Sequence, residues 1–158
     1  MSIICPIGGV IINAVKAFAD PRGWLIELYR QDELDSSQYP AMSYVSMTKP
    51  GVTRGPHEHR EQSDLFAFIG PSTFRLYLWD NRPGSATFGM EQKYEFGESR
   101  PATVIVPPGV AHAYKNIGDS EGIVYNSPNR LYAGWGRQKE VDEIRHESDP
   151  KSPFRVDE

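Results

Sequence analysis

Short apolar runs alternate with turn residues along most of the chain. The runs are rich in Val, Ile, Phe and Tyr, which are enriched in β-strands. They cover residues 9–15, 24–30, 43–49, 64–70, 74–80, 93–98, 103–107, 112–118 and 122–127. The segments DPRG, TKPG, IGPS, NRPGS, PPG and GDSEG lie between them and contain the residues at which a chain reverses. This spacing predicts an all-β sandwich or barrel.

Helical segments are few. Only residues 32–39 and 137–146 have a pattern compatible with a helix, and both segments are short. From about residue 133 the chain becomes polar, which predicts a tail that wraps the surface of a single β domain spanning residues 1–158. We find no internal repeat, low-complexity segment or linker that would mark a second domain.

Composition and charge narrow the functional classes. The 158 residues are 39% hydrophobic and 11% aromatic, which is typical of a globular chain. The single Cys5 cannot form an internal disulfide, and no apolar run reaches the ~18 residues that a membrane span needs. We therefore expect a cytoplasmic protein without a membrane partner. A formal net charge of -4 disfavours binding to nucleic acid, so an anionic ligand would depend on a few well-placed arginines.

Three of the four histidines fall in two short segments. In GVTRGPHEHREQSD, His57 and His59 are two residues apart and would point to the same face of a strand, and Asp64 closes the segment. The second segment, PPGVAHAYKN, contains His112. Imidazole serves near neutral pH both as an acid or base and as a metal ligand. The residue types alone therefore leave both interpretations open.

The two segments resemble the two sequence motifs of the cupin superfamily. The first matches at Gly51, His57 and His59, with Asp64 in the usual place of Glu, and the second matches at Pro107, Gly109, His112 and Asn116. Within the cupins, residues 19 to 150 resemble the dTDP-4-dehydrorhamnose 3,5-epimerase family through DPRGWLIEL, VTRGPH, GSATFG, VPPGVAHAY and the Tyr of GIVYN. The resemblance implies a double-stranded β-helix, the jelly-roll barrel of the cupins.

The resemblance also implies a reaction. The family removes a proton beside the C4 ketone of a nucleotide-linked 4-keto-6-deoxy sugar and returns a proton to the opposite face, without a cofactor. His57 matches the family's base, because histidine titrates near working pH. Tyr125 matches the proton donor across the sugar ring. His112 would line the same cavity and contact the sugar.

The substrate-binding residues that the resemblance implies are mostly arginines. Arg22 and Arg54 match positions that hold the nucleotide phosphates, which suits the bidentate guanidinium group. Glu27 matches a residue that contacts the nucleotide. The family resemblance further implies a homodimer with exchanged N-terminal strands, and GGVIINAV is apolar enough to add to a partner's sheet.

The chain departs from the family pattern where the enolate forms. The simplest alignment places Asp64 where the family has a lysine, and a carboxylate would destabilise a developing oxyanion. By strand alternation, Arg75 lies on the face opposite Leu76 and is the candidate for replacing the missing cation.

Two other functional classes stay open. The first is a metal-dependent cupin enzyme in which His57, His59, Asp64 and His112 bind a divalent transition metal such as Fe, Mn, Ni or Zn. The second is a non-catalytic sugar-binding cupin, because one fold hosts many functions. The motif RG before His57, the segment RGWLIE and the spacing of Tyr125 favour the epimerase, since a metal site needs none of them.

Overall fold

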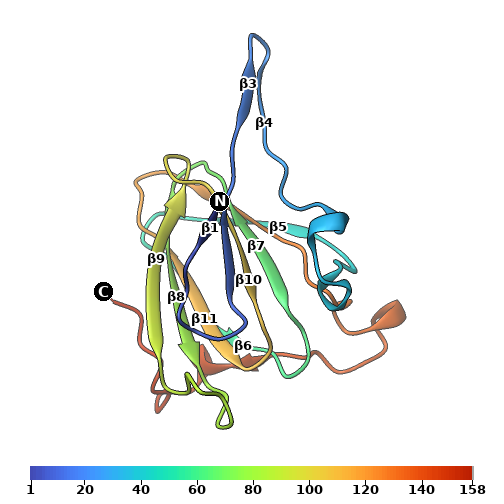
Figure 1. Cartoon of the computed structure of the whole chain (residues 1–158). Helices are drawn as coiled ribbons and strands as arrows, with labels where there is room; N and C mark the ends of the chain where they lie inside the picture. The colour runs from blue at the N-terminus through green and yellow to red at the C-terminus, as the bar shows by residue number, and fades with distance from the viewer. Residues whose placement is uncertain (158) are drawn as a thin grey trace.

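Two antiparallel sheets pack face to face and enclose the core (Figure 1). The structure is a computed structural model that describes residues 1–157. In spatial order, the six-stranded sheet contains β1 (Ser2–Ile3), β2 (Ile11–Ala14), β10 (Ala102–Val106), β7 (Asp64–Phe68), β12 (Gly122–Asn126) and β5 (Tyr44–Thr48). The five-stranded sheet contains β13 (Ile144–Arg145), β6 (Thr53–Glu58), β11 (Val110–Asn116), β8 (Thr73–Asp80) and β9 (Glu91–Gly97).

The remaining elements are small. A hairpin of β3 (Phe18–Asp20) and β4 (Gly23–Leu25) projects from the barrel (Figure 1). Four 3-10 turns follow: η1 (Gln31–Glu33), η2 (Ser36–Gln38), η3 (Trp135–Arg137) and η4 (His146–Ser148). Residues 1–157 contain no α-helix, so the all-β prediction is confirmed. None of the helical turns in that range has the length or apolarity needed to cross a membrane.

The core lies between the two sheets, and β8 shows how the alternation of residues builds it. Phe74, Leu76 and Leu78 are fully buried and face the six-stranded sheet. The ring of Phe68 on β7 lies 5.9 Å from that of Phe74, centroid to centroid. Burial of each such side chain contributes about 1.5–3 kcal/mol to the stability of the folded state.

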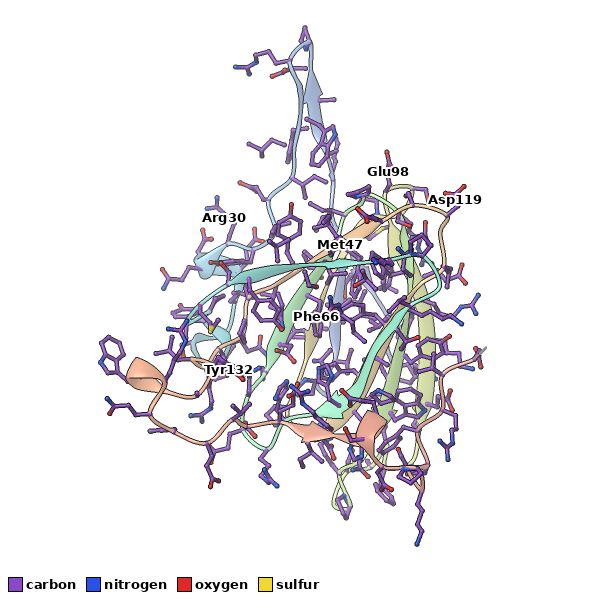
Figure 2. The ribbon with its side chains drawn as sticks, turned by 180° about the vertical axis from the view of Figure 1, so that it is seen from behind. Arg30, Met47, Phe66, Glu98, Asp119 and Tyr132 are labelled. Atoms are coloured by element: carbon purple, nitrogen blue, oxygen red, sulfur yellow. The ribbon has the colours of Figure 1, made fainter. Side chains whose placement is uncertain are left out.

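The outer face of β8 is also covered. Tyr77 and Trp79 alternate to this face, and Phe154 and Val156 of the C-terminal tail pack against them. The tail therefore shields an aromatic surface that would otherwise face water. Figure 2 shows the tail running along the base of the barrel beside the five-stranded sheet.

Two expected elements differ in the structure. Residues 24–30 form a strand only as far as Leu25, where the β3–β4 hairpin ends. Residues 137–146 had a pattern compatible with a helix, but the 3-10 turn η3 ends at Arg137 and residues 144–145 form β13, which pairs with β6. The carboxylate of Asp142 accepts three backbone N–H groups from residues 60–62, so contacts with the barrel replace those of a helix.

An irregularity in β6 determines which of its side chains face the barrel interior. His57 lies opposite His112 and Arg54 lies opposite Tyr114. Two residues of β6, Gly55 and Pro56, therefore lie opposite one residue of β11, Ala113. Such a bulge redirects side chains. It allows Arg54 and His57, three residues apart, to border the same cavity.

Gly55 is the residue that this bulge requires. Its φ is +85°, and a Cβ atom built there would lie 2.6 Å from the carbonyl oxygen of His112. We expect Gly55→Ala to lower the free energy of unfolding by about 1–3 kcal/mol, because it combines a strained conformation with a backbone clash. Urea denaturation measures the change.

Gly51→Ala is the matched control. Gly51 also has a positive φ, +74°, but a Cβ atom there would meet no atom within 4 Å. Its loss of stability should therefore be clearly smaller than that of Gly55→Ala. Equal losses of unfolding free energy in the two variants would show that the close approach of β6 and β11 at Gly55 does not destabilise Gly55→Ala.

Candidate active site

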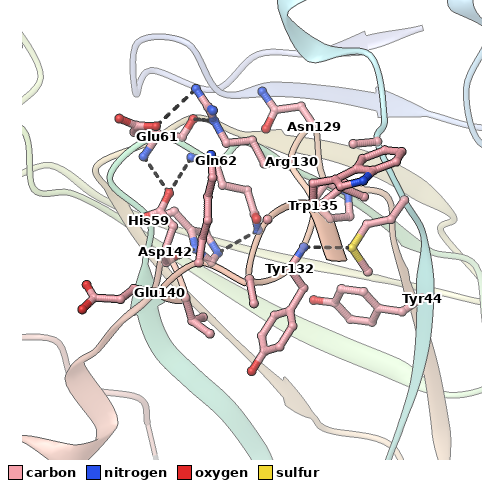
Figure 3. A pocket seen from close by; sticks show the side chains of 18 residues that line it. Tyr44, His59, Glu61, Gln62, Asn129, Arg130, Tyr132, Trp135, Glu140 and Asp142 are labelled. Atoms are coloured by element: carbon pink, nitrogen blue, oxygen red, sulfur yellow. Dashed lines mark hydrogen bonds and ion pairs between the residues drawn. The ribbon is translucent and has the colours of Figure 1, made fainter. Parts of the chain in front are cut away.

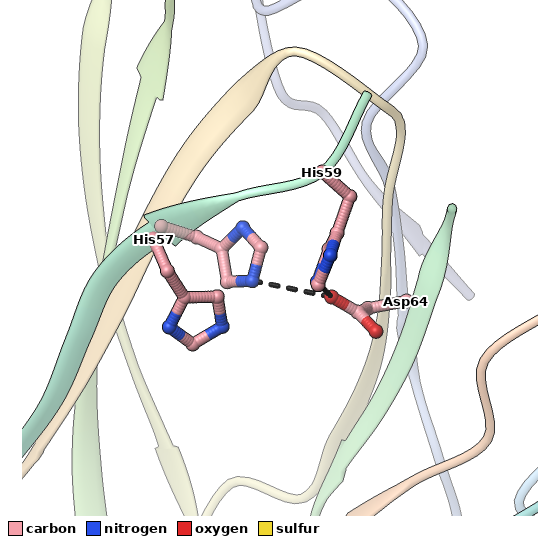
Figure 4. Close-up of side chains that lie close together, drawn as sticks. His57, His59 and Asp64 are labelled. Carbon is pink, nitrogen blue, oxygen red and sulfur yellow. Dashed lines mark ion pairs between the residues drawn. The ribbon is translucent and has the colours of Figure 1, made fainter. Parts of the chain in front are cut away.

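Three histidines and one aspartate meet inside the barrel (Figure 4). His57 belongs to β6 and His59 follows its last residue, while Asp64 begins β7 and His112 lies on β11. One nitrogen or oxygen atom from each residue lies within 4.8 Å of the others. The imidazole centroids of His57 and His59 are 5.7 Å apart, so the expectation that both point into one interior is confirmed.

Asp64 is the centre of this cluster. Its Oδ2 lies 2.9 Å from Nε2 of His59 and 3.2 Å from Nε2 of His112. Its Oδ1 accepts hydrogen bonds of 2.9 Å from the amides of Gln62 and Asn126. A buried carboxylate needs such partners, because the loss of hydration is otherwise uncompensated.

Contacts with backbone carbonyls show that Nδ1 carries a hydrogen in two of the imidazoles. Nδ1 of His112 lies 3.0 Å from the carbonyl of Val110, and a carbonyl can only accept, so this nitrogen carries the hydrogen. Nδ1 of His59 donates to the carbonyl of Asp142 in the same way. Within residues 1–157, neither Nε2 of His112 nor Oδ2 of Asp64 has a well-directed hydrogen bond. Two buried acceptors that face each other would be satisfied by a cation, so this donor set fits a metal ion.

The charge states follow from burial and from the carboxylate. Burial and the neighbouring His112 lower the pKa of His57 to about 2. Burial opposes the charged form of His59, but its contact with Asp64 raises the pKa of His59 to about 9. Burial would also raise the pKa of Asp64, yet contacts with His112 and His59 hold this pKa well below its usual range. Near neutral pH, His59 and Asp64 thus form an ion pair, and His57 is uncharged with a free electron pair.

A cavity of about 380 Å³ opens beside His57. Its lining residues are Tyr44, Ser46, Thr53, Arg54, Gly55, His57, Tyr114, Arg145 and Glu147. The guanidinium of Arg54 is anchored there, because Nε donates to Oγ1 of Thr48 over 2.9 Å and Nη2 donates to the carbonyl of Met47 over 2.7 Å. Arg145 enters from the tail, where β13 places it opposite His57.

A second cavity, of about 400 Å³, lies beside His59 (Figure 3). The barrel contributes Tyr44 and His59 to its wall, and the C-terminal tail contributes Tyr132, Trp135 and Asp142. Figure 3 shows these side chains around the hollow, with the tail forming its outer rim. The tail that sequence analysis treated as a surface wrap therefore contributes to the wall of a pocket.

Tyr44 borders both cavities. Its hydroxyl accepts a 2.8 Å hydrogen bond from Nδ2 of Asn126, and the same amide group donates to Asp64. Burial and the negative charge of Asp64 raise the pKa of Tyr44 to about 12. The hydroxyl is therefore protonated near neutral pH, and the Asn126 amide connects it to Asp64 of the histidine cluster.

Tyr125 does not lie with His57 and His112, and the prediction that the three residues converge on one cavity is wrong. On β12, Val124 and Asn126 face the interior, so Tyr125 faces outward. Its side chain borders a separate pocket of about 550 Å³ on the outer face. The spacing from His112 matched the family, but spacing along the sequence does not fix the face of a strand.

The prediction that Arg75 replaces the family's missing cation is also wrong. Arg75 lies on the outer face of β8, and its guanidinium donates to Oε1 of Glu95 over 2.7 Å. The inner positions of β8 are taken by apolar side chains such as Leu76. Arg75 therefore cannot supply a cation to the cavity.

The expected nucleotide-binding residues divide into two groups. Arg54 lines the cavity beside His57. Arg22 lies in the turn of the projecting hairpin with its side chain 90% exposed, paired with Asp20. Glu27 borders another pocket, formed with residues from the N-terminal strands. Within one chain, neither Arg22 nor Glu27 lines the cavities beside His57 and His59.

Sequence analysis missed three residues that line the cavities, Tyr44, Tyr114 and Arg145, and also Asn126, whose amide donates to the Tyr44 hydroxyl. The sequence pattern held one signal for Tyr114, which is two residues beyond His112 and so shares its face. Arg145 had no signal, because its position depends on the pairing of the tail with β6.

The fold and the cluster define the class of protein, a cupin-type jelly-roll barrel. The structure is similar to that of a dTDP sugar isomerase from Desulfovibrio desulfuricans G20, with a TM-score of 0.84 and 21% identity over 97% of this chain and 94% of that one. It also resembles a dTDP-6-deoxy-D-glucose-3,5-epimerase from Legionella pneumophila in complex with dTDP-4-keto-L-rhamnose, with a TM-score of 0.79 and 20% identity over 98% and 84% of the two chains. The predicted jelly-roll barrel is confirmed.

Sequence comparison identifies the family. The model of dTDP-4-dehydrorhamnose 3,5-epimerase matches residues 5–144. A probable low-salt glycan biosynthesis epimerase of Haloferax volcanii is 34% identical over 78% of this chain and 79% of its own length. A spore coat polysaccharide biosynthesis protein of Bacillus subtilis is 34% identical over 72% and 74%. The chain belongs to the dTDP-4-dehydrorhamnose 3,5-epimerase family, and the prediction of an epimerase of this type is confirmed.

Proposed function

We propose that the protein epimerises a nucleotide-linked 4-keto-6-deoxyhexose at a carbon beside the ketone, without a cofactor. The observation that carries this proposal is the position of the His57 imidazole, which lines a cavity of about 380 Å³ together with Arg54. Burial lowers the pKa of His57 and so leaves the imidazole uncharged. Membership of the epimerase family supports the same reaction. The cavity volume is in the range of small-molecule sites.

His57 is the base in this proposal. It accepts the proton from the carbon beside the ketone, and the electron pair of that C–H bond moves into the enolate. The environment that keeps His57 unprotonated also makes it a weak base before the reaction. Negative charge that develops on the adjacent enolate favours the imidazolium and so raises basicity as the proton moves.

The diphosphate of the substrate is assigned to the arginines at the mouth of the cavity. Arg54 is held by two hydrogen bonds to β5, which orders its guanidinium before binding. Arg145 lines the same cavity, and its Nε donates to Glu143 over 2.7 Å. Guanidinium groups suit phosphate oxygens because they offer parallel N–H donors.

A homodimer is the second part of the proposal. The projecting hairpin exposes Phe18, Trp24 and Leu25, each by more than half of its surface. Trp24 and Tyr125 also border the outer pocket of about 550 Å³. Such an apolar surface favours association with a second copy. In such a dimer, the hairpin of one subunit would lie against the barrel of the other and would carry Arg22 with it. A role of Arg22 in substrate binding would then concern the cavity of the neighbouring subunit.

The N-terminal strand itself is paired within the chain. Residues 11–14 form β2 between β1 and β10 of the same sheet. The segment that stands free of the barrel is instead the β3–β4 hairpin (Figure 1). We therefore assign the exchange to the hairpin and not to GGVIINAV.

The base assignment is tested by solvent exchange. Incubated with dTDP-4-keto-6-deoxy-D-glucose in heavy water, the protein should introduce deuterium at C3, C5 or both. His57→Asn should abolish this exchange, because among residues 1–157 His57 is the histidine that lines this cavity. Proton NMR of the sugar measures it.

Arg54→Ala provides the complementary variant. It should weaken the binding of dTDP about tenfold or more, since a hydrogen bond between charged groups contributes about 1.5–3 kcal/mol. His57→Asn should bind dTDP with the affinity of the wild type, which calorimetry can measure. If His57→Asn retains exchange at the wild-type rate, the base assignment is wrong.

A second candidate function rests on the orphaned acceptors. His57, His59, Asp64 and His112 offer the three imidazoles and one carboxylate that transition metals accept, and Nε2 of His112 and Oδ2 of Asp64 have no well-directed hydrogen bond within residues 1–157. A metal bound there would supply Lewis-acid chemistry to the cavity. His112 is already oriented for it by its bond to Val110.

Elemental analysis separates the two candidates. The epimerase proposal predicts that protein purified without chelator contains less than about 0.1 equivalent of transition metal, and that dialysis against EDTA leaves deuterium exchange unchanged. One equivalent of metal that is lost in His112→Ala, together with loss of exchange after dialysis, would establish the metal-dependent alternative. Protein treated identically but without EDTA is the control.

The dimer prediction concerns the hairpin. Leu25→Asp should shift the protein to a monomer, because it places a charge in the apolar contact. Light scattering after size-exclusion chromatography measures the mass. Phe88→Ser is the matched control, since Phe88 is exposed to a similar degree, 56% against 60%. It lies in the β8–β9 connection at the other end of the barrel (Figure 1), where substitution should leave the mass unchanged. A wild-type monomer would contradict the proposal.

A further inference from the structure

The reaction proposed above needs an acid on the face of the sugar opposite the base, and with Tyr125 outside the barrel this position has no assigned residue. The two sheets form opposite walls of the interior. His57 lies on β6 of the five-stranded sheet, whereas Tyr44 lies on β5 of the six-stranded sheet. Both residues line the cavity of about 380 Å³. A sugar ring held in that cavity would have one residue on each side.

The hydrogen bonding of Tyr44 suits proton donation. Its oxygen accepts from Nδ2 of Asn126 over 2.8 Å, so this contact does not use the hydroxyl hydrogen. Nδ2 of Asn126 is held in turn by its second bond, to Asp64. Within residues 1–157, no hydrogen bond consumes the hydrogen of the Tyr44 hydroxyl. This hydrogen is available to a ligand, and the amide stabilises the oxygen after the proton has left.

The other tyrosines near the cavities fit less well. Tyr114 lies on β11, in the same sheet as His57, and its hydroxyl lies 3.1 Å from Oγ of Ser46. Only 4% of Tyr114 is exposed, so little of it can reach a ligand. Tyr132 borders the cavity beside His59 but does not line the one beside His57.

We propose that Tyr44 is the proton donor opposite His57 and that Asn126 is its positioning residue. This inference rests on the proposed function. In the step, the O–H bond of Tyr44 breaks and its proton joins the enolate carbon. The electron pair of the enolate double bond forms the new C–H bond while the C4 ketone is restored. The tyrosinate keeps its hydrogen bond from Asn126 and regains a proton from solvent, to which His57 loses the proton it took.

The test separates removal of the proton from its return on the opposite face. With dTDP-4-keto-6-deoxy-D-glucose in heavy water, Tyr44→Phe should keep deuterium exchange within about threefold of the wild type, because His57 can still remove a proton and return a deuteron to the same face. Formation of the inverted sugar should fall about 100-fold or more, the usual size of a general-acid effect. Proton NMR measures both rates in one sample.

Tyr125→Phe is the matched control, since it removes a hydroxyl from the neighbouring strand β12 outside the cavity. Both of its rates should equal those of the wild type. Inversion at the wild-type rate in Tyr44→Phe overturns the proposal, and so does an equal loss of exchange and inversion in that variant. A wild-type chain that shows neither reaction with this substrate refutes the proposed function itself, a result that the variants cannot mimic.

Asn126→Leu tests the positioning role. Inversion should fall while exchange is retained, and the double variant Asn126→Leu/Tyr44→Phe should invert no more slowly than Tyr44→Phe alone, because Asn126 acts through Tyr44. If the fold losses of inversion rate in the two single variants multiply in the double variant, Asn126 does not act through Tyr44. If Asn126→Leu does not fold, Asn126→Ser is measured in the same cycle, since its shorter side chain cannot bridge Tyr44 and Asp64.

Discussion

The buried carboxylate of Asp64 is the interaction on which the interior depends. Only 1% of the residue is exposed, and moving an unpaired carboxylate to such a position costs several kcal/mol. Its partners come from both sheets: His112 from the five-stranded sheet and Asn126 from the six-stranded sheet, with His59 at the connection between β6 and β7. The charge thus joins the two walls of the barrel beside the cavities that His57 and His59 line.

The same carboxylate explains why two neighbouring histidines differ. His59 touches Asp64 and is held as a cation, whereas His57 faces the cavity and is kept uncharged by burial and by His112. Asn126 extends the network to Tyr44 on the opposite wall. One buried charge therefore holds His59 as a cation on one side and, through Asn126, contacts the protonated hydroxyl of Tyr44 on the other.

The sequence specified the fold more fully than the site. Most strands followed from their apolar runs, and the His57–His59 pair followed from alternation, because both depend on local periodicity. Tyr125 was assigned to the cavity from the family resemblance and Arg75 from strand alternation, yet neighbours such as Asn126 and Leu76 occupy the inward positions of the same strands. The bulge at Gly55 had no apparent signal in the sequence, since it arises from the register between β6 and β11. The position of Arg145 likewise depends on a tertiary contact of the tail.

Asp64, which stands where the family has a lysine, has a structural role that the sequence did not indicate. Asp64 does not line the cavity beside His57, and its Oδ2 lies against the Nε2 atoms of His59 and His112. A metal at the cluster would have to displace the proton that charges His59, so protons and metal ions compete for the same site. The ion pair already provides the positive charge that the carboxylate requires. The donor set fits a metal, but it does not need one to satisfy its charge, and this balance favours the cofactor-independent reaction.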